Sequence, residues 1–272
     1  MVSGLPSEES FLHPAERWRQ AVRDRAVPQA IVDNAPEPPW SFEPEMFRWR
    51  PEEDAKQPLR PSRRRALEAL PERGSVLDVG VGGGASSLGL APRAEMITGV
   101  DSLEGMLELF QASSRAVGVE ARAVLGTWPD VADAVDPVDV AVCHHVIYGV
   151  TEVEDFIIAL TAWARHRVVL ELSADHPQAG LDPLWKALHG IERPERRVAD
   201  EAEAVLVSMG LDVEREDIVL PPRTREVTPE LVAFARRRLY VDPDRDPEIA
   251  DLLRARTPQD QRVVALWWPG AA

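Results

Sequence analysis

The sequence predicts an α/β fold in which helices cover both faces of a doubly wound, mostly parallel sheet. From residue 62 to residue 173, short apolar runs alternate with helical segments. These runs are nearly continuous, as in strands that are buried on both faces. A glycine cluster, VLDVGVGGGASS at 76–87, lies at the end of the first run. Doubly wound sheets carry their ligand-binding loop at this position.

The elements of this core follow one another without long gaps. The apolar runs predict strands at 75–80, 96–101, 119–126, 138–145 and 167–173. The segments between them predict helices at 63–70, 86–91, 103–117 and 152–166. Pro92 should stop the short second helix, and Gly118 should close the third.

After residue 173 the alternation becomes irregular. Further helices are expected at 179–190, 198–210, 228–241 and 246–256, and further strands at 211–222 and 261–270. We expect the last strand to run antiparallel. The main domain is therefore assigned to 62–272, with helical insertions near 180–195 and 222–258.

The first 61 residues form a separate leader. A helix is expected from about Ala15 to Asp33, interrupted by Pro28. A proline-rich segment with several aromatic residues follows, and a disordered linker would be poor in aromatics. We expect this leader to pack on the main domain and to act as a lid over the active site, with Trp40 and Phe47 touching the substrate.

Composition restricts the classes of function. The chain has 272 residues with 44% hydrophobic and 28% charged residues, as in ordinary globular proteins. Its net charge of −15 opposes attraction to nucleic acid or anionic lipid. It has no basic start with an apolar core, no apolar run of about 18 residues, and a single cysteine, Cys143. We therefore expect a cytoplasmic protein that acts on a small molecule; the oligomeric state stays open.

The glycine loop fits two spacings. Gly80, Gly82 and Ala85 match the dinucleotide pattern G-x-G-x-x-G/A, whereas Gly80, Gly82 and Gly84 match G-x-G-x-G. Asp78 favours the second, because a carboxylate at this strand end would repel a pyrophosphate and attract a cationic ligand. A second acid, Asp101, ends the next strand, where a carboxylate can accept hydrogen bonds from ribose hydroxyls.

Three segments in this order resemble the motifs of class I S-adenosylmethionine-dependent methyltransferases: 76–87, ITGVDSLEGML at 97–107 and VDVAVCHHVIYGV at 138–150. The resemblance covers about 62–219, with a weaker tail to Trp268. It implies a Rossmann-like fold and S-adenosylmethionine as the cofactor. The cofactor-binding residues it implies are Asp78, Gly80, Gly82 and Gly84 at the methionine end, Asp101 at the ribose, and Ser102, Met106, Gly126, Thr127 and Trp128 near the adenine.

Methyl transfer to oxygen or nitrogen can require a base that takes the proton of the acceptor. His144 and His145 end the fourth strand, where the resemblance places the transferable methyl group. Strand alternation predicts that only one of them faces the cavity, and the resemblance favours His145. Tyr148 is a third candidate, as base or as hydrogen-bond donor. An aromatic residue of the first insertion, Trp185, is a further candidate for binding the substrate.

Two alternatives to a small-molecule methyltransferase stay open at this stage. The chain could bind S-adenosylmethionine without methylating anything, as a sensor or an inactive partner, or it could methylate a protein. No zinc-type spacing of histidines or cysteines is present, so no metal is expected. His166, His176 and His189 have no partner at a metal-binding spacing and are assigned structural roles.

Overall fold

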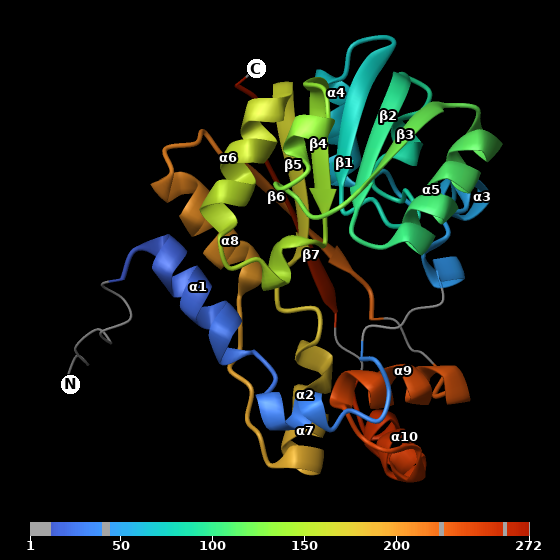
Figure 1. The fold of residues 1–272 in the computed structure, drawn as a ribbon, viewed down its shortest axis with the longest axis vertical. Helices are drawn as coiled ribbons and strands as arrows, with labels where there is room; N and C mark the ends of the chain where they lie inside the picture. The colour runs from blue at the N-terminus through green and yellow to red at the C-terminus, as the bar shows by residue number, and fades with distance from the viewer. Residues whose placement is uncertain (1–11, 40–43, 223–225, 258–259, 272) are drawn as a thin grey trace.

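A computed structural model describes residues 12–39, 44–222, 226–257 and 260–271. Its centre is a seven-stranded sheet in the order β3-β2-β1-β4-β5-β7-β6 (Figure 1). The strands are β1 (Gly74–Val79), β2 (Ala94–Asp101), β3 (Glu120–Leu125), β4 (Val138–His144), β5 (Ala164–Ser173), β6 (Glu214–Leu220) and β7 (Gln261–Pro269). Strands β1 to β5 pair in parallel, and β7 pairs antiparallel with both β5 and β6. The predicted doubly wound sheet with an antiparallel last strand is confirmed.

Helices cover both faces of the sheet. One face packs against α6 (Val153–Trp163), α8 (Val198–Ser208) and α1 (Pro14–Asp24), whose Trp18 is fully buried. The other face packs against α4 (Pro61–Ala69) and α5 (Glu104–Val117), with Phe110 at its centre. Strands β1 and β4 and the second half of β5 are mostly buried, as expected for a sheet covered by helices on both faces.

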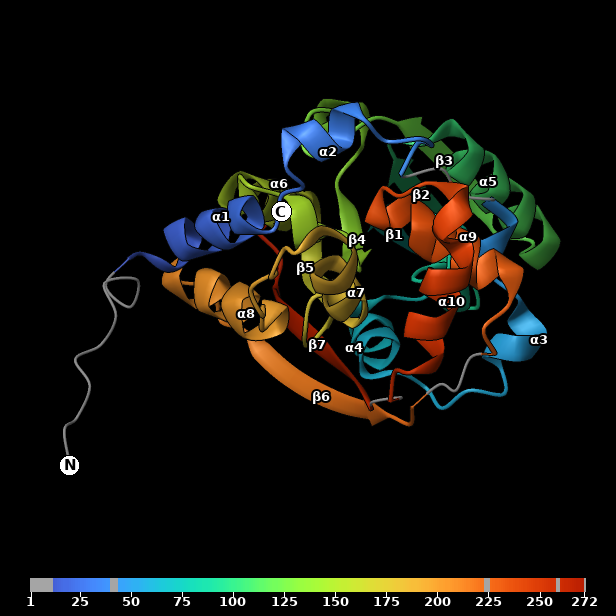
Figure 2. The same ribbon diagram turned by 90° about the horizontal axis from the view of Figure 1, so that it is seen from below.

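The two predicted insertions meet in space. The helices α7 (Asp182–His189), α9 (Pro229–Leu239) and α10 (Asp246–Arg254) share a third apolar cluster. We call these three helices the helical unit. Figure 2 shows them in front of the sheet when the molecule is seen from below, at the carboxyl ends of the parallel strands. The helical unit therefore lies on the side where doubly wound sheets bind their ligands.

The leader is folded against the rest of the chain. Besides α1 it contains α2 (Gln29–Asp33), the 3₁₀ turn η2 (Pro44–Phe47) and α3 (Pro51–Asp54). The expected interruption near Pro28 is observed, because α1 ends at Asp24 and α2 begins at Gln29. Trp40, which we expected at the substrate, lies outside the described residues.

Some elements of the core are shorter than predicted; the helix expected at 152–166, for example, is α6 (Val153–Trp163). The helix expected at 86–91 is reduced to the single turn η3 (Leu88–Leu90). The strand expected at 138–145 ends at His144, because His145 adopts a left-handed backbone conformation with φ 59°. The early end of β4 changes the direction of the His145 side chain, and therefore the geometry of the site.

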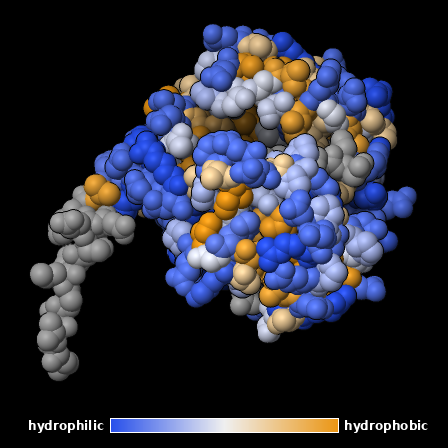
Figure 3. All heavy atoms as spheres, turned by 60° about the horizontal axis from the view of Figure 1, so that its bottom comes forward, coloured by the Kyte–Doolittle hydropathy of each residue, from blue (hydrophilic) through white to orange (hydrophobic). Residues whose placement is uncertain are grey.

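No helix within the described ranges is both long and apolar enough to cross a membrane. Figure 3 shows hydrophilic side chains over most of the face that it brings forward, with apolar side chains scattered between them.

Candidate active site

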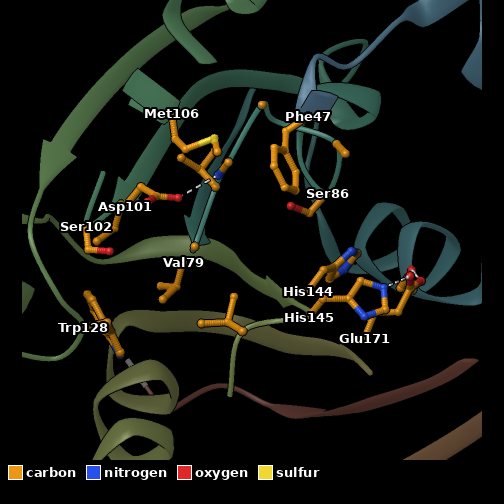
Figure 4. A pocket seen from close by; sticks show the side chains of 18 of the residues that line it. Phe47, Val79, Ser86, Asp101, Ser102, Met106, Trp128, His144, His145 and Glu171 are labelled. Atoms are coloured by element: carbon orange, nitrogen blue, oxygen red, sulfur yellow. Dashed lines mark hydrogen bonds and ion pairs between the residues drawn. The ribbon is translucent and has the colours of Figure 1, made fainter. Parts of the chain in front are cut away.

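A cavity of about 760 Å³ opens at the carboxyl ends of β1, β2, β4 and β5. Figure 4 shows that its side chains form two groups. Asp101, Ser102, Met106 and Trp128 lie at one end, and His144, His145 and Glu171 lie at the other. We call these the acidic end and the histidine end. The volume lies within the range of about 300–1,000 Å³ that is usual for small-molecule sites.

The glycine loop forms the wall between β1 and β2. Gly80 and Gly82 line the cavity with left-handed φ values of 73° and 50°, which residues with a side chain rarely adopt. Nothing lies within 4 Å of the place that a Cβ at Gly82 would take, so the backbone there is open to a ligand. Asp101 holds the loop, because its Oδ2 accepts a hydrogen bond from the Gly82 N–H at 3.0 Å. Its Oδ1 accepts one from Leu103 N–H at 3.0 Å.

Two residues that we predicted at the cofactor lie behind this loop and do not line the cavity. Asp78 is completely buried and accepts hydrogen bonds from Ser86 Oγ (2.7 and 2.9 Å) and Ser87 Oγ (2.6 Å). Burial raises its pKa to about 6. Gly84 faces the core, where an added Cβ would come within 2.5 Å of Leu88. Both residues support the glycine loop from the side of the core. The prediction that they contact the ligand directly is therefore corrected.

The other predicted residues of the acidic end are brought together. Ser102, Met106, Gly126, Thr127 and Trp128 all line the cavity. Trp128 is 4% exposed and its Nε1–H donates to the carbonyl of Phe156 at 3.3 Å. The indole is therefore fixed by α6 and presents an apolar wall, which suits a flat ring as ligand.

Both histidines line the cavity, contrary to our expectation from strand alternation. The alternation stops because β4 ends at His144 and His145 has a positive φ. The Nε2 atom of His144 is buried, and no described residue forms a hydrogen bond with it. Burial lowers the pKa of His144 to about 4, although the nearby Glu171 carboxylate opposes that shift. His144 is therefore a neutral imidazole at pH 7.

Both ring nitrogens of His145 have partners. Its Nδ1 lies 2.7 Å from Tyr148 Oη, and its Nε2 lies 3.3 Å from Glu171 Oε1. Tyr148 Oη also accepts the Ser173 N–H at 2.8 Å. If the Tyr148 hydroxyl donates to Nδ1, then Nε2 carries the proton that faces Glu171. Tyr148 itself does not line the cavity, and burial raises its pKa to about 12.

Glu171 is a site residue that our sequence analysis missed. It is 3% exposed, and its carboxylate accepts hydrogen bonds from Arg60 Nη1 at 2.7 Å and Ser62 Oγ at 2.5 Å. Burial opposes its charge, but the hydrogen bond from His145 and the Arg60 guanidinium hold the pKa of Glu171 well below its ordinary value. The signal was present, because Glu171 is the one acid inside the apolar run of β5.

The leader forms part of the cavity wall. Phe47 lines the cavity, and its carbonyl oxygen lies so close to the glycine loop that a Cβ at Gly83 would be 1.9 Å from it. Arg60 and Arg63 also line the cavity, and Arg63 forms a two-pronged ion pair with Asp54 at 2.6 and 2.8 Å. Figure 4 shows the Phe47 ring above Ser86 and the histidines.

Trp185 is not part of this cavity. It is 1% exposed and lies in the apolar cluster of the helical unit, beside His189 and Tyr240. A hydrophobic side chain in an amphipathic helix gives no sign of which surface it packs against, and here it packs inside the insertion. Our assignment of Trp185 as a residue that touches the substrate in the cavity is therefore corrected.

Part of the chain matches a known protein family. The family described as a methyltransferase domain matches residues 76–167. That stretch holds the glycine loop, Asp101 and both histidines of the cavity. The match spans β1 to β5 of the sheet and leaves the leader and the helical unit unmatched. No curated protein matches this chain.

Solved structures resemble the fold of this chain at low identity. A Bacillus halodurans protein named as a candidate methyltransferase is 14% identical, with a TM-score of 0.50 over 78% of this chain and 97% of its own. The YcgJ protein of Bacillus subtilis is 16% identical, with a TM-score of 0.49 over 77% and 99%. The magnesium protoporphyrin IX methyltransferase of Synechocystis, solved with bound SAH, is 17% identical, with a TM-score of 0.47 over 92% of each chain.

Proposed function

We propose that this protein transfers the methyl group of S-adenosylmethionine to an oxygen or nitrogen atom of a small organic molecule. The observation that carries the proposal is the continuity of the cavity, which joins the acidic end to the histidine end. One end offers a carboxylate and a flat apolar wall for a nucleoside. The other offers a neutral imidazole where a second molecule would have to enter.

The residues of the acidic end fit S-adenosylmethionine. The open space at Gly82 lets the ligand approach the backbone, and Asp101 has lone pairs left for ribose hydroxyls after its two backbone contacts. Among the described residues that line the cavity, the two arginines, Arg60 and Arg63, are bound to carboxylates, so neither is free to pair with a pyrophosphate. This donor set favours a ligand without phosphates.

When bound, S-adenosylmethionine supplies a methyl group that its sulfonium already activates for in-line displacement. The chain then has to align the acceptor atom, exclude water and take a proton. Phe47 and the other leader residues cover the cavity from outside the sheet, which supports the proposal that the leader sets the shape of the acceptor site.

We assign the proton-accepting role to His144. Its Nε2 is buried without a partner, whereas both nitrogens of His145 are engaged. A pKa of about 4 suffices, because the acceptor oxygen becomes strongly acidic as its bond to carbon forms. The buried Glu171 carboxylate then offsets the positive charge on His144. His145 and Tyr148 are positioning residues that hold this carboxylate and the end of β5.

A small acceptor fits the observations better than a macromolecule. Residues between 47 and 63 form part of the cavity wall, and the net charge of −15 repels nucleic acid. A protein acceptor and a cofactor sensor without turnover are the competing functions.

Incubation of the full-length protein with radiolabelled S-adenosylmethionine and fractionated cell extract tests the proposal. We expect label in low-molecular-weight metabolites, and we expect His144→Ala to remove it. His166→Ala is the matched control, since His166 is exposed and its Nε2 lies 3.6 Å from the Asp139 carboxylate, away from the cavity. Label in a protein band would support protein methylation instead, and cofactor binding without any labelled product would support a sensor.

A further inference from the structure

The short connection between α3 and α4, residues 55–60, forms part of the cavity wall at the histidine end. We call it the rim loop. Arg63 closes the loop from the α4 side by a two-pronged ion pair with Asp54, at 2.6 and 2.8 Å. Arg60 ties the end of the loop to β5, because its Nη1 donates to Glu171 Oε1 at 2.7 Å. The rim loop is therefore held at both ends beside the site.

Gln57 of the rim loop carries an amide that is free to bind a ligand. The residue lines the cavity, and its backbone N–H donates to the Asp54 carbonyl at 3.0 Å. Pro58, which also lines the cavity, follows it and restricts the backbone further. The side-chain amide forms no hydrogen bond with any residue that the structure describes. It can donate two hydrogen bonds and accept others, so it suits an uncharged polar group.

The charges at the histidine end cancel one another. Within the described residues, the charged side chains that line this end are Asp54, Arg60, Arg63 and Glu171. They form two ion pairs, Arg63 with Asp54 and Arg60 with Glu171. An anionic group beside Arg60 would meet the Glu171 carboxylate, and a cationic group beside Glu171 would meet Arg60. Because a charge that leaves water without an unpaired opposite charge is destabilised, this end favours an uncharged acceptor.

An apolar surface lies in the same part of the cavity. The Phe47 ring lines the cavity and is drawn above Ser86 and the histidines in Figure 4. Its side chain is large and the residue is 40% exposed, so it offers surface that a ligand can cover. An aromatic wall with a few polar groups is the usual lining of a site for a small organic molecule.

We propose that Gln57 determines which acceptor binds, by hydrogen bonding to an uncharged hydroxyl or carbonyl group of that molecule while its apolar part packs on Phe47. This inference rests on the proposed function and narrows its substrate class to uncharged, partly apolar molecules. The atom that receives the methyl group belongs beside His144. Gln57 therefore acts on binding of the acceptor and leaves the proton transfer to His144.

Ion exchange of a small-molecule extract at pH 7 provides the first test. The extract is separated into anionic, cationic and uncharged pools before incubation, so that the charge belongs to the acceptor and not to the methylated product. Each pool is then incubated with the full-length protein and radiolabelled S-adenosylmethionine. We expect labelled product mainly from the uncharged pool. Labelled product mainly from a charged pool would overturn the proposal.

Gln57→Leu provides the second test, because leucine removes the amide with little change in size. The amount of the uncharged pool that gives half the maximal rate should rise roughly 3- to 10-fold, while the maximal rate changes little. Gln111→Leu is the matched control, since Gln111 is an exposed amide on α5 outside the cavity. Equal half-saturating amounts in Gln57→Leu and Gln111→Leu would overturn the proposal.

Calorimetry with S-adenosylhomocysteine on the same samples separates this inference from the proposed function. All three proteins should bind the cofactor product equally. Labelled small molecules with no effect of Gln57→Leu defeat only the role of Gln57. Cofactor binding with no labelled small molecule from any pool defeats the proposed function itself.

Discussion

His145 Nε2 faces the buried Glu171 carboxylate at 3.3 Å, while His144 Nε2 has no partner among the described residues. Adjacent histidines thus have different surroundings, because one ends a strand and the other turns into the left-handed region. The partner of His145 is a carboxylate held by two residues of α4 and its cap, Ser62 and Arg60. This arrangement supports the proposed division of roles between His144 as proton acceptor and His145 as positioning residue.

Alanine variants of His144 and His145 should show that the two residues have different roles. We expect His144→Ala to lower kcat by roughly 10²–10⁴-fold with little change in cofactor affinity. His145→Ala should lower the free energy of unfolding by about 1–3 kcal/mol, because Tyr148 and Glu171 each lose one polar partner. Single-turnover kinetics and urea unfolding measure the two effects. The assignment fails if His145→Ala gives the larger loss of rate and His144→Ala behaves like His166→Ala.

The pH dependence of kcat/KM should report His144. Because burial lowers its pKa to about 4, the imidazole stays neutral down to acid pH and accepts protons throughout the neutral range. The acid limb of the profile should lie near pH 4, below the value of about 6.5 for an ordinary histidine. An acid limb near 6.5, or one that persists in His144→Ala, would contradict the assignment.

Asp78 should make stability depend on pH in the opposite sense to most carboxylates. Its folded pKa of about 6 lies above the ordinary 3.8, so its contribution is fully present below pH 3.8 and is lost as pH rises through 6. The loss amounts to about 3 kcal/mol. Relative to wild type, Asp78→Asn should therefore gain up to about 3 kcal/mol between pH 4 and pH 7.5.

Urea unfolding at both pH values measures that gain, with Asp133→Asn as the exposed control. A difference between Asp78→Asn and wild type that does not change with pH would show that Asp78 titrates normally.

The sequence predicted the sheet well because strand and helix periodicity are local properties. All seven strands and the helices α4 to α10 lie within a few residues of the predicted ranges. The site was harder to predict where tertiary contacts determine which way a side chain points. Ser86 and Ser87 draw Asp78 away from the cavity, and no pattern in the sequence signals that hydrogen bonding. The positive φ of His145 likewise invalidated an argument based on alternation.

Contacts between residues far apart in the sequence explain why Glu171 was missed and why Trp185 was misplaced. Glu171 matters through Arg60, 111 residues earlier in the chain, and such a pair cannot be read from spacing. Trp185 packs with residues of α9 and α10, which belong to a separate insertion in the sequence. An acid within an apolar strand would have been the only local indication of Glu171.

The contact between leader and glycine loop can be tested at Gly83. A Cβ there would lie 1.9 Å from the carbonyl oxygen of Phe47, and backbone cannot yield as a flexible side chain can. Gly83→Ala should therefore detach the segment Pro44–Phe47, at a cost of about 1–3 kcal/mol, and speed tryptic cleavage at Arg48. Limited proteolysis read by mass spectrometry measures the rate.

Gly149→Ala is the control for this variant, since nothing lies within 4 Å of its added Cβ. Equal cleavage rates in Gly83→Ala, Gly149→Ala and wild type would show that the leader does not rest on the loop in solution.

Calorimetry with S-adenosylhomocysteine tests the central proposal, an S-adenosylmethionine site at the acidic end, most directly. We expect the wild type to bind it and Asp101→Ala to bind it roughly 10- to 150-fold more weakly, which corresponds to about 1.5–3 kcal/mol for hydrogen bonds to a charged group. Asp136→Ala, with a side chain that is 94% exposed, should bind as the wild type does. Absence of binding to the wild type, or binding of NADH in its place, would contradict the assignment of this cavity.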